Sequence, residues 1–355
     1  MRTLKYREAI DEAIRQAMAA DERVFVFGVG VDDAKGIFGT TRGAFEQFGS
    51  ARVFDTPLSE AMLTGVAVGT ALSGLRPILV HARNDFLLLT MDQIVNNAAK
   101  WRYMCGGRLS VPMVIRAIIG RGWGQAAQHS QSLQAMFAHV PGLRVIMPAM
   151  PYDAKGLLLS ALRGNGPVIC LEHRWLYDRT GPVPEVPYTV EIGAAAVTRP
   201  GRDVTIVATS LMVWEALEAA KLLAEEGIEA EVIDLRTVRP LDTATVLASV
   251  TKTGRLVVAD TAWRSFGVSA EVVARVAEEA VDALKGPVVR VALPDVPTPA
   301  SSVLERAYYP GPQEIVAAVR RTFERTKAPA AVDDPGRAVA MVAHDARPPD
   351  FKGPF

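Results

Sequence analysis

A single glutamate opens one of the most apolar helical stretches of the sequence. Residues 54–60 read FDTPLSE and lead into TGVAVG at 64–69. Thr56 belongs to a residue type that caps helices, Pro57 suits the first helical position, and Glu60 then falls near the first turn. Glu60 could merely complement the helix dipole. However, a carboxylate among so many Gly, Ala, Val and Leu residues needs a partner, because an unpaired buried charge is costly.

Two further side chains are candidates for contacts with a ligand. Phe86 follows an apolar run and the polar stretch HARND at 81–85, and His129 lies in the segment QHSQ at 128–131. Taken alone, a phenylalanine is more often a core residue, and an isolated histidine is more often structural or exposed. Both residues therefore need support from their surroundings before they are given a role.

A glycine pair partly matches a dinucleotide-binding motif. Gly28 and Gly30 follow a run of apolar residues, as the first two glycines of G-x-G-x-x-G do, but Asp33 stands at the third position. The segment is better interpreted as a tight turn from a strand into a loop. A nicotinamide cofactor has little support.

Composition excludes several classes of partner. The 355 residues carry 39 basic and 39 acidic side chains, which gives no electrostatic reason to expect nucleic acid or an anionic membrane. No apolar run is long enough to span a membrane, and the N-terminal residues do not form a signal peptide. Cys105 and Cys170 form neither a metal motif nor a disulfide framework. These features predict a cytoplasmic protein.

The elements that must position these residues alternate along the chain. A helix is expected at 7–20 from its apolar stripe, and further helices are expected at 60–72, 91–103, 212–227 and 268–284. Between them lie short continuous apolar runs, which indicate parallel strands covered on both faces. These runs are residues 24–29, 77–80, 111–115, 143–147, 168–171, 204–208, 230–235, 256–259 and 288–293.

The spacing of these elements predicts an α/β protein with two doubly wound domains. The first is expected at 1–183 and the second, smaller one at 191–327. Between them, the Pro-rich segment GPVPEVP at 181–187 reads as the beginning of a linker placed at 184–190. An irregular tail is expected at 328–355 because it has no clear periodicity.

Several blocks of the sequence, in order from about residue 3 to 325, resemble the β subunits of the pyruvate and branched-chain 2-oxo acid dehydrogenases. These enzymes depend on thiamine diphosphate and belong to the transketolase-like superfamily. The blocks are DTPLSE at 55–60, GLRP at 74–77, MDQIVNNAAK at 91–100, QHSQ at 128–131, AHVPG at 138–142, DAKGL at 153–157, VIDLRT at 232–237, PLD at 240–242 and FGV at 266–268. The resemblance implies a pyrimidine-binding domain followed by a transketolase C-terminal-type domain.

The resemblance also implies roles for individual residues. Glu60 matches the glutamate that hydrogen-bonds a ring nitrogen of the cofactor's pyrimidine and so favours its imino tautomer. Phe86 matches the aromatic residue that stacks on this ring, and Leu58 is placed among the cofactor contacts. His129 matches a histidine that faces the substrate or the incoming lipoyl group. On this basis Glu60 and His129 are the candidate catalytic residues.

What the sequence lacks implies a partner. In the family, the diphosphate and its Mg²⁺ are held by a Gly-Asp-Gly motif and a distant Asn on an α chain, and this sequence contains no Gly-Asp-Gly. The resemblance therefore implies an α₂β₂ heterotetramer with a shared site and no magnesium ligands on this chain. It further implies a 2-oxo acid substrate and acyl transfer to a lipoyl acyltransferase.

Three departures from the family pattern leave alternatives open. Val29 and Gly30 stand where acidic residues are usual after Gly28, and HARND at 81–85 replaces an apolar or aromatic stretch. These polar residues could reshape the substrate pocket, so an acetoin-cleaving or ketol-transferring enzyme remains an alternative. A non-catalytic scaffold subunit is a further alternative, against which Glu60, Phe86 and His129 argue. A structural K⁺ of some relatives lies around 162–167, where Gly164 replaces the acidic residue.

Overall fold

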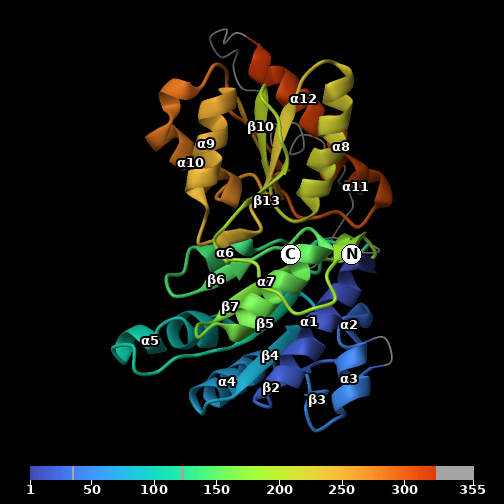
Figure 1. Cartoon of the computed structure of the whole chain (residues 1–355), viewed down its shortest axis with the longest axis vertical. Coiled ribbons are helices and arrows are strands. Elements are labelled where there is room, and N and C mark those ends of the chain that lie inside the picture. Colours follow the sequence, from blue (N-terminus) through green and yellow to red (C-terminus); the bar gives the residue numbers. More distant parts are fainter. Residues whose placement is uncertain (34–35, 121–123, 325–355) are drawn as a thin grey trace, which may run out of the picture.

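The computed structural model describes residues 1–33, 36–120 and 124–324. Two α/β layer structures are stacked end to end, with the N-terminal half in blue and green and the C-terminal half in yellow to red (Figure 1). Within the described residues, no helix is long and apolar enough to cross a membrane. The tail expected at 328–355 lies outside the described residues.

The first sheet has seven strands in the order β12-β6-β7-β5-β4-β2-β3. All neighbours from β6 to β3 are parallel, which confirms the predicted parallel sheet, while β12 is an antiparallel edge strand. Strands β5 and β7 are buried along their whole length, and the charged residues within them, Arg116 and Glu172, pair with each other at 2.6 Å. The strands are β2 (Val24–Gly28), β3 (Val53–Phe54), β4 (Arg76–His81), β5 (Val114–Ile119), β6 (Arg144–Ile146), β7 (Val168–His173) and β12 (Thr237–Arg239).

Helices cover both faces of this sheet. Helix α1 packs against α7 and α3, whereas α4 packs against β4 and the two short helices η1 and η2. The helices of this half are α1 (Tyr6–Ala20), α2 (Gly36–Gly39), α3 (Arg42–Phe48), α4 (Glu60–Leu72), η1 (Asn84–Thr90), η2 (Asp92–Ala98), α5 (Trp101–Met104), α6 (Gln134–Ala138), α7 (Pro151–Arg163) and η3 (Arg174–Leu176).

The single helix expected at 91–103 is divided into a π-helical segment, η2, and the short helix α5. Within η2 the side-chain amide of Asn97 donates to the main-chain carbonyl of Asp92, five residues earlier, at 3.2 Å. A side chain that competes for a main-chain carbonyl favours such a widened turn. Hydrophobic periodicity alone does not reveal this competition.

The predicted linker is held to the first half by hydrogen bonds. The beginning of the Pro-rich segment, residues 181–183, belongs to strand β8 (Thr180–Val183), which pairs antiparallel with β1 (Arg2–Lys5). The buried ammonium of Lys155 donates to the carbonyls of Pro184, Glu185 and Val186 at 2.7, 3.1 and 3.2 Å. The segment therefore lies along α7.

The second sheet has five strands in the order β14-β13-β10-β11-β9, of which only β9 is antiparallel. Helices α8 and α12 pack together on one face, and α9 and α10 pack together on the other (Figure 1). The strands are β9 (Ala196–Arg199), β10 (Val204–Ala208), β11 (Ala230–Asp234), β13 (Leu256–Trp263) and β14 (Val289–Leu293). The helices are α8 (Leu211–Glu225), α9 (Thr243–Thr253), α10 (Val268–Glu279), η4 (Val281–Ala283), α11 (Ser302–Tyr308) and α12 (Pro312–Phe323).

Strand β12 connects the two halves, because it leaves the second half and completes the first sheet. Arg236, in the left-handed conformation with φ 53°, precedes it and binds Asp153 of α7 at 2.9 Å. One hydrophobic cluster continues across the boundary, from Met147 in the first half to Leu235 and Val238 in the second. The sequence did not predict that a strand of the second half would join the first sheet.

Candidate functional site

The segment that leads to Glu60 is extended and is fixed at its start. The carboxylate of Asp55 accepts the N–H of Gly30 at 2.6 Å, so the chain passes the end of β2 before it turns into α4. Helix α4 begins at Glu60, with Ser59 at the N-cap. The prediction that Thr56 caps this helix was wrong, since the hydrogen bond of Asp55 holds Thr56 in the extended segment outside it.

The glycine pair forms a turn, as predicted. A Cβ on Gly28, whose φ is +142°, would lie 2.3 Å from the carbonyl oxygen of Val80 on the neighbouring strand. Gly30 is also left-handed, with φ +72°. The first glycine is therefore required by strand packing and the second by the turn that meets Asp55.

Helix α4 is buried on one face only. Leu63 and Ala67 face the core, whereas Met62 and Val66 are 50% and 46% exposed. The expectation that Glu60 enters close-packed apolar surroundings was therefore wrong for the isolated chain: Glu60 is half-buried, and Leu58 before it is exposed. An apolar face of this kind on a helix indicates a surface that another element covers.

The hydroxyl of Thr56, close to Glu60 in sequence, is buried without a hydrogen-bond partner among the described residues. A buried hydroxyl of this kind is costly unless a further group binds it. The carboxylate of Glu60 is half-buried and lies at the N-terminus of α4. Both features fit a polar ligand beside this helix end.

The structure brings Phe86 and His129 together. Their ring centroids are 5.3 Å apart, and the rings meet edge to face at 81°. Both side chains are half-buried. Phe86 lies in η1, which packs against α4, the helix of Glu60. The three predicted residues therefore lie on elements that adjoin one another, and two of them are in contact.

Consecutive polar side chains before Phe86 hold the segment that carries His129. The carboxylate of Asp85 accepts the main-chain N–H and the side-chain amide of Gln131, at 3.2 and 2.9 Å. Asn84 donates to the carbonyl of Gln131 at 2.9 Å and accepts the N–H of Leu133 at 3.0 Å. We call Asn84, Asp85 and Gln131 the polar clamp.

Arg83 extends this arrangement, because its guanidinium donates to the carbonyl of Gly120 at 2.9 Å. Burial lowers the pKa of Arg83, and the nearby carboxylate of Asp85 opposes that shift. The held segment also contains Ala126 in the left-handed conformation, with φ 55°, which is unfavourable for a residue with a Cβ. The bonds at 83–85 therefore fix a strained segment.

The hypothesis that the side chains of 81–85 reshape the substrate pocket needs correction for Arg83, Asn84 and Asp85. These three side chains are buried and point to the main chain of the neighbouring segment. Their role as a support for His129 was missed by the sequence analysis. The signal was present, since a run of polar residues directly after a buried strand must find partners.

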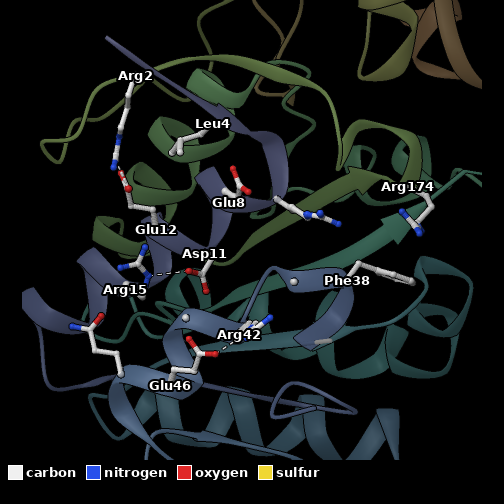
Figure 2. Close-up of a pocket in the computed structure, with 14 residues that line it drawn as sticks. Arg2, Leu4, Glu8, Asp11, Glu12, Arg15, Phe38, Arg42, Glu46 and Arg174 are labelled. Atoms are coloured by element: carbon white, nitrogen blue, oxygen red, sulfur yellow. Dashed lines mark hydrogen bonds and ion pairs between the residues drawn. The ribbon is translucent and has the colours of Figure 1, made fainter. Parts of the chain in front are cut away.

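A groove of about 950 Å³ lies elsewhere, between β1, α1 and α3 (Figure 2). None of Leu58, Glu60, Phe86 and His129 lines it. Five arginines and four acidic side chains line it, and some of them pair: Arg15 binds Asp11 and Arg42 binds Glu46, each at 2.8 Å.

Among the described residues, no group of three or more His, Cys, Asp or Glu side chains could hold a metal ion. The groups that the chain brings to the candidate site are a half-buried carboxylate, an aromatic face and an imidazole. This donor set suits contacts to a heteroaromatic ring and a small polar substrate.

Two family models define the class of protein. The transketolase pyrimidine-binding domain matches residues 2–180, and the transketolase C-terminal domain matches residues 193–315. The fold is thus that of a transketolase-like protein, as the sequence predicted, and this family implies dependence on thiamine diphosphate. A solved structure described as an inactive β4 tetramer of a split-gene transketolase is 27% identical, with a TM-score of 0.72 over 90% of this chain and 98% of that chain.

Relatives narrow the class further. The acetoin:2,6-dichlorophenolindophenol oxidoreductase subunit β of Cupriavidus necator is 47% identical and covers 92% of this chain and 99% of its own length. The mitochondrial pyruvate dehydrogenase E1 component subunit β-1 of Arabidopsis thaliana is 45% identical, with 90% of each chain covered. The chain belongs to this family of dehydrogenase β subunits, and the resemblance found in the sequence is confirmed.

Proposed function

We propose that this chain contributes the pyrimidine-facing half of an active site that a second, α-type subunit completes. The reaction is the oxidative decarboxylation of a 2-oxo acid, followed by acyl transfer to lipoamide. The contact between Phe86 and His129, on a segment packed against the helix of Glu60, carries this proposal. Bound thiamine diphosphate would supply the electron sink for decarboxylation.

Each of the three side chains has a task that its surroundings support. Glu60 holds a proton at a pyrimidine ring nitrogen, from the N-terminal end of α4. Phe86 offers an aromatic face to the same ring, and the contact with His129 fixes its orientation. His129 donates or accepts a proton at the oxygen of the substrate, and Leu58 contributes apolar contact.

The apolar face of α4 supports the need for a partner. Leu58, Met62 and Val66 are exposed beside Glu60, where a folded monomer gains nothing from exposing them. We propose that the α subunit covers this face and supplies the ligands of the diphosphate and Mg²⁺. An α₂β₂ assembly that acts with a lipoyl acyltransferase would follow.

Three finer points complete the proposal. We place the domain limits at 1–183 and 191–327, with a linker at 184–190, and the end of β8 at Val183 supports the first limit. The free thiols of Cys105 and Cys170 support a cytoplasmic location. Nucleic acid and membranes are not proposed as partners, since the net charge is zero.

Cleavage of acetoin is a second candidate reaction, because the Cupriavidus necator relative is named as an acetoin oxidoreductase subunit. The two reactions differ in substrate: a 2-oxo acid loses CO₂, whereas acetoin is cleaved at a carbon–carbon bond without CO₂ release. The roles of Glu60 and Phe86 are the same in both.

The test is to produce this chain together with an α-type subunit and to screen pyruvate, branched-chain 2-oxo acids and acetoin. Reduction of 2,6-dichlorophenolindophenol and release of CO₂ are followed in parallel. Dye reduction with CO₂ release supports the main proposal, and dye reduction with acetoin but without CO₂ supports the second. Equal activity of the α-type subunit without this chain would contradict both.

A further inference from the structure

A buried hydrogen bond joins the segment of His129 to the second half of the molecule. The side-chain amide of Gln134, the first residue of α6, donates to the carboxylate of Asp260 on β13 at 2.7 Å. The two residues are 0% and 1% exposed and lie 126 positions apart in the sequence. Helix α6 lies at the boundary between the two halves (Figure 1), so this bond crosses that boundary.

The carboxylate of Asp260 is a well-fixed acceptor. Besides the amide of Gln134, it accepts the hydroxyl of Thr209 at 3.2 Å and the main-chain N–H groups of Ala262 and Ser269 at 3.4 and 3.3 Å. Burial raises the pKa of Asp260, and these donors, with Gln134 the strongest, oppose that shift. Strand β13 lies between β14 and β10, so the main chain that carries this carboxylate is held on both sides.

Packing is incomplete beside this hydrogen bond. A cavity of about 100 Å³ is lined by Asp260 and Thr261 from the second half and by Gly120 and His173 from the first. Side chains that border a cavity have fewer dispersion contacts to hold them in place. The directional bonds of Gln134, which include one of 3.3 Å to the hydroxyl of Thr261, therefore carry more of the task of placing this end of α6 against β13.

The segment of His129 is attached to both halves. Gln131, two residues after His129, is held by the polar clamp of the first half, and Gln134 is held by Asp260 of the second. Strand β12 and the hydrophobic cluster that crosses the boundary fix the two halves relative to each other. Asp260 is therefore a stationary anchor for this segment.

We propose that Asp260 is a positioning residue for His129, which acts from the second half through the amide of Gln134. The second half thus contributes to the candidate site, although all the predicted site residues lie in the first half. The effect on the position of His129 is independent of the reaction, whereas the effect on turnover rests on the proposed function.

The first test is the reaction of His129 with diethyl pyrocarbonate in the full chain, followed by mass spectrometry. Gln134→Met keeps the length of the side chain but cannot donate a hydrogen bond, so His129 should react about 3- to 10-fold faster than in wild type. Asp260→Ala should have the same effect. Asp260→Asn keeps an acceptor oxygen, so its His129 should react within about 2-fold of the wild-type rate.

A double variant separates this contact from a general loosening of the fold. If the contact carries the effect, Gln134→Met combined with Asp260→Ala should be no more reactive than either single variant. Asp242→Ala is the matched control, because Asp242 also accepts three hydrogen bonds, all of them from the second half, and it should leave His129 unchanged. If Asp260→Ala does not fold, Gln134→Met and Asp260→Asn still provide the comparison.

Turnover is the second measurement. In the assembled enzyme, Gln134→Met should lower kcat by about 3- to 10-fold and leave the affinity for thiamine diphosphate unchanged. The proposal would be overturned if His129 reacted at the wild-type rate in Gln134→Met, or if the effects of the two substitutions multiplied in the double variant. Faster reaction of His129 with unchanged kcat would support the positioning role and contradict the proposed role of His129 in the reaction.

Discussion

The two sides of the candidate site are built in opposite ways. On the side of His129, the polar clamp and the ring of Phe86 fix the segment through contacts within the chain. On the side of Glu60, helix α4 exposes Met62 and Val66, and the hydroxyl of Thr56 is buried without a partner among the described residues. Contacts within the chain complete the side of His129, whereas the side of Glu60 has the exposed apolar surface of a subunit interface.

This difference indicates where a partner acts. A partner that covers α4 would exclude water from Glu60 and strengthen its hydrogen bond to a ligand, since electrostatic interactions gain from a lower local dielectric. The side of His129 does not need such help.

The largest effect is expected from Glu60→Gln, on the side of the site that helix α4 forms. The variant keeps the shape of the side chain but cannot hold the proton at the pyrimidine, so kcat of the assembled enzyme should fall by about 10²- to 10³-fold. Glu271→Gln, in the first turn of α10, is the control and should change nothing. Retained activity in Glu60→Gln would remove the catalytic role of this residue.

The next prediction concerns the exposed face of α4. The double variant Met62→Asp and Val66→Asp should fold normally, because both side chains are about half exposed, but it should bind the α-type subunit at least about 100-fold more weakly. Val281→Asp, at a valine that is 55% exposed in η4, is the control. Analytical ultracentrifugation checks assembly, and normal assembly of the double variant would place the interface elsewhere.

Acid should act on the stability of the first half through His81, the last residue of β4. Burial lowers its pKa to about 4 from 6.5, so the unfolded chain binds a proton between these values and the folded chain does not. Stability from this group is therefore lost as the pH falls, by about 2 kcal/mol between pH 6.5 and 5. Urea unfolding of His81→Leu should show a shallower pH dependence than wild type, whereas exposed His139→Gln should match wild type. Equal slopes in wild type and His81→Leu would contradict this account.

A smaller effect is expected from the polar clamp. Asp85→Ala removes both bonds to Gln131, and His129 should then react about 5- to 10-fold faster with diethyl pyrocarbonate, followed by mass spectrometry. Asp85→Asn keeps an acceptor oxygen and should stay near wild type, as should the exposed Asp282→Ala. Unchanged reactivity of His129 in Asp85→Ala would show that the clamp does not hold it.

The smallest effect is expected from Phe86→Ala in the assembled enzyme. Loss of one stacking face should weaken binding of thiamine diphosphate by about 3- to 10-fold, with less change in kcat at saturation. Leu88→Ala, two residues further along η1 and 41% exposed, is the control. If affinity is unchanged in Phe86→Ala, the stacking role is wrong.

Much of the fold was predictable because its signals are local. The helix at 60–72 has the observed limits, and the continuous apolar runs gave the parallel strands of both sheets. The division of 91–103 was not predictable from periodicity, since it depends on a side-chain amide that competes for a carbonyl. Strand β12 has only three residues and ends before Pro240, so it is too short to show a hydrophobic periodicity.

The candidate site was predictable only in part. The resemblance supplied Glu60, Phe86, Leu58 and His129 as isolated positions, and the structure shows a contact for one pair of them. The polar clamp joins residues 46 and 47 positions apart, which no local pattern can pair. The exposed face of α4 was not predicted, because the sequence pattern of an apolar helix does not show whether its own chain or a partner subunit covers it.

We propose that this chain holds only part of a thiamine diphosphate site. Calorimetric titration of thiamine diphosphate with Mg²⁺ into the chain alone, and then into the chain assembled with an α-type subunit, tests it most directly. We expect no measurable binding to the chain alone and tight binding to the assembly. Tight binding by the isolated chain would mean that it holds the diphosphate itself, which would contradict the shared site.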